Sequence, residues 1–194
     1  MNRVCVFCGS SQGARPAYGA TARGLVAALA ERDLGLVYGG ANVGLMGELA
    51  NAARTCGVHV TGVMPSSLVE REIAHGALDD LRIVGSMHER KELMAALSDG
   101  FVALPGGMGT LEELFEVLTW AQLGLHRKPC GLLDVEGFFT PLEAFLDHTV
   151  TEGFLALEHR RLLLVDTDPG ALLDRMWAYE PAFTEKWTDR PGRA

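Results

Sequence analysis

Short apolar runs that end at glycine alternate with longer segments of helical period over most of this 194-residue chain. Because parallel neighbouring strands need crossover connections, the alternation predicts an α/β fold: one doubly wound, Rossmann-like domain with a parallel sheet flanked by helices. Most runs are apolar throughout, as expected for strands that helices cover on both faces. The expected strands are Val4–Cys8, Leu34–Tyr38, Val58–Val63, Arg82–Val84, Phe101–Leu104, Cys130–Leu133 and Leu162–Val165, and the expected helices lie near 16–31, 43–56, 87–98, 110–124, 138–151 and 169–179.

The length fits one domain, which we place at residues 1–180, followed by a peripheral tail at 181–194. A domain of this size buries roughly 70% of the surface of its unfolded chain, so it needs no disulfide or metal for stability. Its net charge of −8 disfavours nucleic acid as a partner. Nothing in the pattern interrupts the domain before its tail.

The chain is expected to be cytoplasmic. The apolar run at its N-terminus is shorter than a signal peptide's core, and no segment reaches the roughly 18 unbroken apolar residues of a membrane span. The cysteines Cys5, Cys8, Cys56 and Cys130 are then expected to be reduced thiols. Cys5 and Cys8 form a C-x-x-C without a second pair, so we predict no metal site.

Three of the expected strands run directly into glycine-rich turns that open helices, at 8–13, 38–47 and 104–110. The carboxyl ends of parallel strands lie on one edge of the sheet, so the three turns can meet around one crevice. Each turn can present backbone N–H groups to an anion such as phosphate. We include Ser10 and Gly40, from the first two turns, among the predicted substrate-binding residues, although tight turning alone would equally explain the second turn.

The third turn does not match the known nucleotide loops. No Gly-Lys-Ser/Thr follows its glycines, and the stretch Gly107–Glu112 lacks the third glycine of a dinucleotide fingerprint. The sequence therefore favours a monophosphate ligand.

Glu113 is the residue to which we assign the chemistry. We expect Thr110 to cap the helix that follows the third turn, and Glu113 to lie in its first turn, where the helix dipole lowers the pKa of the carboxyl. An ionised carboxylate beside a sugar phosphate can stabilise an oxocarbenium-like ribose and activate water. The source of the proton for the leaving base is not indicated. Alternatively, Glu112, Glu113 and Glu116 are a solvated helix start.

Two adjacent cations, Arg90 and Lys91, lie on the preceding helix. Neighbouring helical residues point about 100° apart, so we expect one to reach the ligand and the other a phosphate or a carboxylate. The planar fork of Arg90 suits two-pronged binding, and Arg90 can both position substrate and hold Glu113. A solvated basic helix face is the alternative.

The stretches 87–91 and 105–113 closely resemble the Lonely Guy (LOG) family of cytokinin riboside 5′-monophosphate phosphoribohydrolases, whose signature is Pro-Gly-Gly-x-Gly-Thr-x-x-Glu. The likeness continues from Phe7–Ser11 through Gly44–Gly47 to Lys128-Pro129, and covers the chain to about Asp168. The resemblance implies a cofactor-free homodimer. It also implies hydrolysis of the N-glycosidic bond of adenosine 5′-monophosphates, plain or N6-substituted, to the free base (adenine or a cytokinin) and ribose 5-phosphate.

The resemblance further implies that Arg90 and Glu113 are the catalytic pair. The residues that it implies for substrate binding are Glu72, Lys91, Gly107, Met108, Gly109, Thr110, Leu111, Glu112 and Thr119. Ala41 and Met108 depart from residues frequent in the family, which leaves the preferred base open.

The sequence leaves two alternative functions open and disfavours a third. A non-catalytic carrier, similar to the molybdenum-cofactor carrier proteins, would need the phosphate-binding turns but not the pair Arg90 and Glu113. A dimeric scaffold with a vestigial site is a third possibility. Members of the family have carried the label lysine decarboxylase, which the sequence disfavours, because the one lysine near the turns, Lys91, adjoins Arg90.

Overall fold

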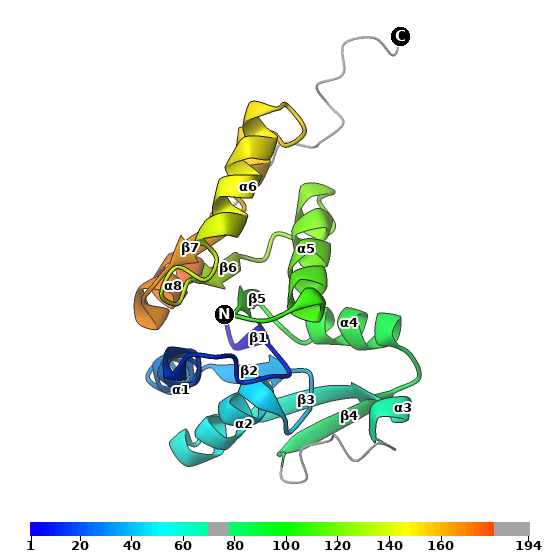
Figure 1. Ribbon diagram of the computed structural model, residues 1–194. Helices are drawn as coiled ribbons and strands as arrows, with labels where there is room; N and C mark the ends of the chain where they lie inside the picture. Colours follow the sequence, from blue (N-terminus) through cyan, green and yellow to red (C-terminus); the bar gives the residue numbers. More distant parts are fainter. Residues whose placement is uncertain (70–77, 181–194) are drawn as a thin grey trace.

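Seven parallel strands form one sheet in the computed structural model, which describes residues 1–69 and 78–180 (Figure 1). The strands are β1 (Arg3–Phe7), β2 (Gly35–Tyr38), β3 (Val60–Pro65), β4 (Asp80–Val84), β5 (Gly100–Ala103), β6 (Cys130–Leu133) and β7 (Leu163–Asp166). Their order in the sheet is β4-β3-β2-β1-β5-β6-β7. The predicted Rossmann-like fold is confirmed.

The helices connect the strands across both faces of the sheet. They are α1 (Pro16–Ala30), α2 (Gly44–Cys56), α3 (Ser66–Val69), α4 (Met87–Ala96), α5 (Met108–Gln122), α6 (Thr140–Thr151), α7 (Leu157–Arg160) and α8 (Pro169–Trp177). Every strand and helix expected from the sequence is present, with ends within two residues of those predicted. Only α3 and α7, of four residues each, were not predicted, because they are too short to show a helical period.

Alternate residues of β1 belong to two separate hydrophobic cores. Val4 and Val6 pack with α1, α2 and α8, whereas Cys5 and Phe7 pack with α4, α5 and α6. Burial on both faces explains why the strands are apolar throughout. Cys5 and Cys8 lie in opposite cores, and all four cysteines are free thiols.

The strand order reverses at β1: β2 to β4 follow one another on one side of β1, and β5 to β7 on the other. β1 itself pairs with β2 and with β5. A parallel sheet opens a crevice where the order reverses, outside the carboxyl ends of these strands. Cys8 follows β1 there, and Leu104 follows β5. The topology therefore places two of the predicted turns on either side of one crevice.

Two predictions concern residues outside the described part. Glu72 belongs to segment 70–77, and the predicted tail to 181–194. Within the two described ranges, no helix is both long enough and apolar enough to cross a lipid bilayer.

Candidate active site at the carboxyl edge of the sheet

The three glycine-rich turns meet, as the sequence predicts. The backbone N–H of Gly9 donates to the carbonyl of Pro105 at 3.1 Å, which joins the first turn to the third. The N–H of Leu45 donates to the carbonyl of Gly9, also at 3.1 Å, which joins the second turn to the first. Backbone hydrogen bonds thus fix the edge of the crevice.

Packing explains some of the glycines at this edge and not others. A Cβ on Gly106 would collide with Oγ1 of Thr110 and lie 2.8 Å from the nitrogen of Gly9, and a Cβ on Gly39 would collide with the guanidinium of Arg90. A Cβ on Gly107 or Gly109, in contrast, would meet no described heavy atom within 4 Å. The open space beside these last two glycines is available to a ligand.

Replacing Gly106 and Gly109 separately by Ala should distinguish the two kinds of glycine. We expect Gly106→Ala to destabilise the fold by about 2 kcal/mol, since Thr110 and Gly9 must shift. Gly109→Ala, inside α5, should leave stability unchanged or raise it by about 0.5–1 kcal/mol. It should nonetheless weaken binding of the nucleoside monophosphate that the sequence predicts, measured with AMP as the probe, at least tenfold. Urea unfolding measures the change in stability, and calorimetric titration measures the change in AMP affinity. Unchanged AMP affinity in Gly109→Ala would show that the open space beside Gly109 does not hold the ligand.

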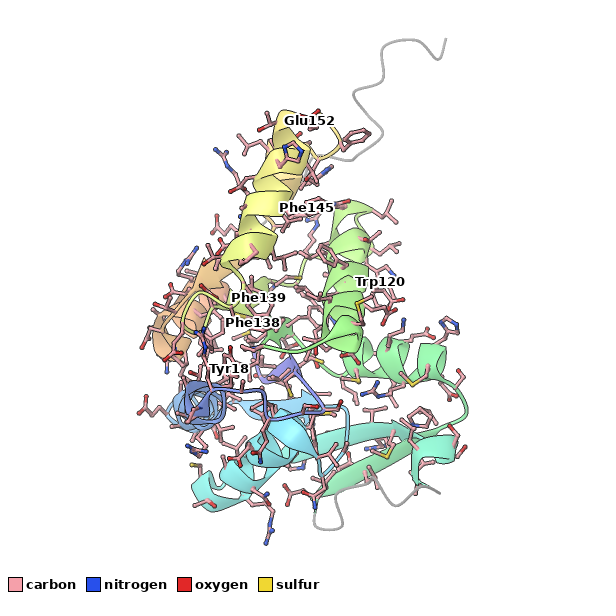
Figure 2. The ribbon with its side chains drawn as sticks, viewed as in Figure 1. Tyr18, Trp120, Phe138, Phe139, Phe145 and Glu152 are labelled. Atoms are coloured by element: carbon pink, nitrogen blue, oxygen red, sulfur yellow. The ribbon has the colours of Figure 1, made fainter. Side chains whose placement is uncertain are left out.

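A cavity of about 300 Å³ lies where the first and third turns meet, lined by the segments 9–13 and 105–107. Its remaining walls are the side chains of Tyr18, Leu45 and Phe138. Phe138 packs edge-on against Tyr18 and Phe139, with ring centroids 5.7 and 4.8 Å apart (Figure 2). Ser10 lines the cavity as predicted, whereas sequence analysis missed the three side-chain walls.

The start of α5 presents backbone N–H groups without a side-chain cap beside this cavity. Gly107 is the N-cap residue and provides no side-chain cap, so the prediction that Thr110 caps the helix was wrong. Thr110 is the third residue of α5, and its buried side chain packs against Gly106. The uncapped N–H groups and the positive end of the helix dipole together favour an anion.

Arg90 reaches from α4 past Gly39, just after β2, and past Val63 of β3 to α5. Its Nε donates to the carbonyl of Val63 at 3.0 Å, and its Nη1 donates to Oε1 of Glu113 at 3.1 Å. The side chains of the pair are only 10% and 12% exposed. The predicted contact between Arg90 and Glu113 is therefore present, and it is a buried ion pair.

The acidity of Glu113 differs from the prediction. Burial raises the pKa of the carboxyl above its ordinary value; Arg90 opposes this shift, and the neighbouring Glu112 adds to it. The predicted lowering by the helix dipole was wrong for two reasons. Glu113 is the sixth residue of α5, beyond the first turn where the dipole acts strongly, and it is largely removed from water.

Lys91 contacts other carboxylates of α5 than Arg90 does. Its Nζ donates to Oε1 of Glu112 and, at 3.0 Å, to Oε1 of Glu116. Both cations of α4 thus reach carboxylates of α5, and the structure does not place Lys91 toward the cavity. Burial alone would lower the pKa of Lys91, but the hydrogen bonds to Glu112 and Glu116 raise it above its ordinary value.

The remaining predicted site residues have different surroundings. Met108 is 85% exposed at the start of α5, whereas Leu111 packs against the core beneath that helix. Gly40 has a positive φ of 78° and packs close to Val63, which is a structural reason for glycine there. Thr119 lies nine residues beyond Thr110 on α5, about 13.5 Å along the helix axis. The structure does not bring Thr119 to the turns of its own chain.

Comparison with known proteins identifies the family of the chain. Residues 46–176 match a family model described as "Possible lysine decarboxylase". The cytokinin riboside 5′-monophosphate phosphoribohydrolase LOG7 of Arabidopsis thaliana is 49% identical over 94% of this chain and 84% of its own length. The rice enzyme LOG, of the same description, is 47% identical over 93% of this chain and 75% of its own.

Among solved structures, the fold is similar to a molybdenum cofactor binding protein from Rippkaea orientalis. The TM-score is 0.69 at 22% identity, over 91% of this chain and 96% of that one. The fold and the site define an α/β protein of the doubly wound class, with glycine-rich turns around a crevice at its topological switch point. The chain belongs to the LOG family, together with the phosphoribohydrolases to which it is similar over nearly its whole length.

Proposed function

We propose that this chain hydrolyses the N-glycosidic bond of adenosine-type nucleoside 5′-monophosphates and releases the free base and ribose 5-phosphate. The observation that carries the proposal is the buried pair of Arg90 and Glu113, next to uncapped helix donors at an open glycine turn. The names of the relatives support the same reaction.

In this proposal the 5′-phosphate lies at the start of α5, where Gly107 and Gly109 leave room for it. Glu113 stabilises the oxocarbenium-like ribose and removes a proton from the attacking water, whose oxygen bonds to C1′. The base leaves with the electron pair of the broken C1′–N bond and takes up one proton. The raised pKa of Glu113 fits a carboxylate that accepts the proton of the water. Arg90 holds Glu113 in place.

Two other functions have less support. A Schiff-base decarboxylase needs a lysine whose pKa is lowered, whereas two carboxylates raise the pKa of Lys91. A carrier similar to the molybdenum-cofactor proteins needs no buried pair of Arg90 and Glu113, and the likeness to those proteins at 22% identity extends to the fold alone.

The test is to incubate purified protein with AMP, N6-isopentenyl-AMP and the two matching nucleosides. Free base and ribose 5-phosphate are quantified by chromatography. We expect release from the monophosphates and none from the nucleosides, and the ratio of the two nucleotide rates gives the preferred base. Saturable nucleotide binding without any base release would refute the hydrolase and favour the carrier.

We also propose that the chain is a cytoplasmic homodimer. The four free thiols suit a reducing compartment. Large apolar side chains are exposed just after α5, on α6 and in the segment from the end of α6 to the start of α7; α5 and α6 extend beyond the sheet (Figure 1). These side chains are Leu123, Leu125, Phe145, Phe154 and Leu157. A surface of this kind marks a protein interface. Thr119, too distant from its own site, can line a nucleotide site from the partner copy.

Phe145→Glu tests the interface directly. Phe145 is 60% exposed, so the substitution should leave the monomer folded while it places a charge in the apolar contact. We expect light scattering to show a dimer for the unchanged protein and a monomer for the variant at micromolar concentration. A variant that stays dimeric would place the interface on another face.

A further inference from the structure

Lys91 ties α4 to α5 immediately beside the catalytic pair. Its side chain is 10% exposed, and its ammonium contacts Glu112 and Glu116, whose side chains are 55% and 25% exposed. The two glutamates are four residues apart on α5, a spacing at which like charges repel. Lys91 offsets that repulsion on the same helix that carries Glu113.

The network contains three carboxylates and two cations. Glu112, Glu113 and Glu116 come from α5, and Arg90 and Lys91 come from α4. Arg90 pairs with Glu113, so Lys91 alone among the described residues compensates the other two carboxylates. Without Lys91, an uncompensated carboxylate would stand directly beside Glu113 on the chain.

We propose that Lys91 is a positioning residue for Glu113: its ammonium neutralises Glu112 and Glu116, which flank Glu113 along α5, and so leaves Glu113 paired with Arg90. The proposal rests on the proposed function and gives Lys91 a role besides the substrate binding that the family resemblance implies.

The surroundings of Glu113 support an electrostatic role for Lys91. Burial and Glu112 raise the pKa of the Glu113 carboxyl, whereas Arg90 and Lys91 lower it. The thiols of Cys5, on β1, and of Cys8, just after β1, are close enough to Glu113 to be influenced by its charge. Burial raises the pKa of both thiols, so they stay neutral. Among the described groups, the charge at Glu113 therefore depends on the two cations of α4 and on Glu112.

The experiment measures the pH profile of kcat/KM for AMP in Lys91→Met, Lys91→Arg and the triple variant K91M/E112Q/E116Q. The acidic limb of this profile is the fall of kcat/KM as Glu113 becomes protonated. We expect its midpoint to rise by roughly one pH unit in Lys91→Met, the size of shift expected when one nearby charge is lost in a partly buried site. Lys91→Arg keeps the charge, so its limb should stay in place. The triple variant removes both charges that Lys91 compensates, so its limb should return toward that of the unchanged protein.

Lys128→Met is the matched control. Lys128 also anchors α4, because its Nζ donates to the carbonyl of Ala95 at 2.8 Å, but it faces none of the three carboxylates. Loosening α4 should lower activity equally at every pH. If Lys91→Met likewise lost activity equally at every pH, with its acidic limb unmoved, the proposal would be overturned. Lys91 would then only hold α4 against α5, without an electrostatic effect on Glu113.

A second measurement does not depend on activity. NMR titration of the ¹³C-labelled Glu113 carboxyl should give a higher midpoint in Lys91→Met than in the unchanged protein, and an unchanged one in Lys128→Met. Equal midpoints would overturn the proposal even if the chain proved to have another substrate. Should Lys91→Met fail to fold, the triple variant is compared with E112Q/E116Q, which differs from it only in keeping Lys91. The midpoint of Glu113 should be lower in E112Q/E116Q than in the triple variant. A protein without base release but with the expected midpoints would refute the proposed function alone.

Discussion

Glu113→Gln is expected to lower base release from AMP by about 10³-fold, the loss typical of removing an essential acid–base group. Gln has the shape of Glu, and its amide oxygen can still accept the hydrogen bond from Arg90. The variant cannot carry the negative charge that stabilises an oxocarbenium-like ribose, nor accept the proton of the attacking water. The expected result is a folded protein that binds AMP and hardly cleaves it.

The measurement is a single-turnover assay of base release, with AMP affinity determined separately by calorimetry. Glu92→Gln provides the control, because Glu92 is an exposed carboxylate on α4. The unchanged protein should lose activity as the pH falls through the raised pKa of Glu113, and this acidic limb should be missing from the residual rate of Glu113→Gln. A variant that keeps a tenth or more of the rate would exclude Glu113 as the catalytic carboxylate.

The sheet could be predicted from the sequence because two local features mark its strands: their apolar composition and the glycine turns at their ends. Runs such as Cys130–Leu133 are apolar throughout, which indicates helices on both faces, and glycine turns mark where strands end. The order of the strands places the turns after β1 and β5 beside one another. The site's location therefore follows from topology, without any knowledge of side-chain contacts.

Contacts between distant parts of the chain could not be predicted in the same way. Tyr18 and Phe138 wall the cavity together although they are far apart in sequence, and no local pattern relates them. Thr110 has the residue type of a helix cap, but its side chain is occupied by packing against Gly106, and the helix begins earlier. The spacing of Glu112 and Glu116 could have indicated the contact with Lys91, since two like charges on one helix face are stabilised by a cation between them.

Arg90→Met is expected to lower the free energy of unfolding by about 3 kcal/mol near neutral pH. The side chain of Glu113 is 12% exposed, and the substitution leaves its carboxylate buried without a counter-charge. Burial already raises the folded-state pKa of Glu113, and loss of Arg90 removes the largest opposing influence. The destabilisation is full above that raised pKa and shrinks as the pH falls toward the ordinary pKa of glutamate, where the folded state binds the proton.

Urea unfolding of the variant and the unchanged protein at pH 8 and pH 5 measures this dependence, and the difference in stability should be smaller at pH 5. The double variant R90M/E113Q removes the buried charge altogether and should recover part of the stability at pH 8. Equal destabilisation at both pH values would instead assign the loss to the hydrogen bond between Arg90 and the carbonyl of Val63, which protonation of Glu113 does not change. Arg90 would then stabilise the edge of the sheet through that hydrogen bond, and its pairing with Glu113 would matter for the reaction alone.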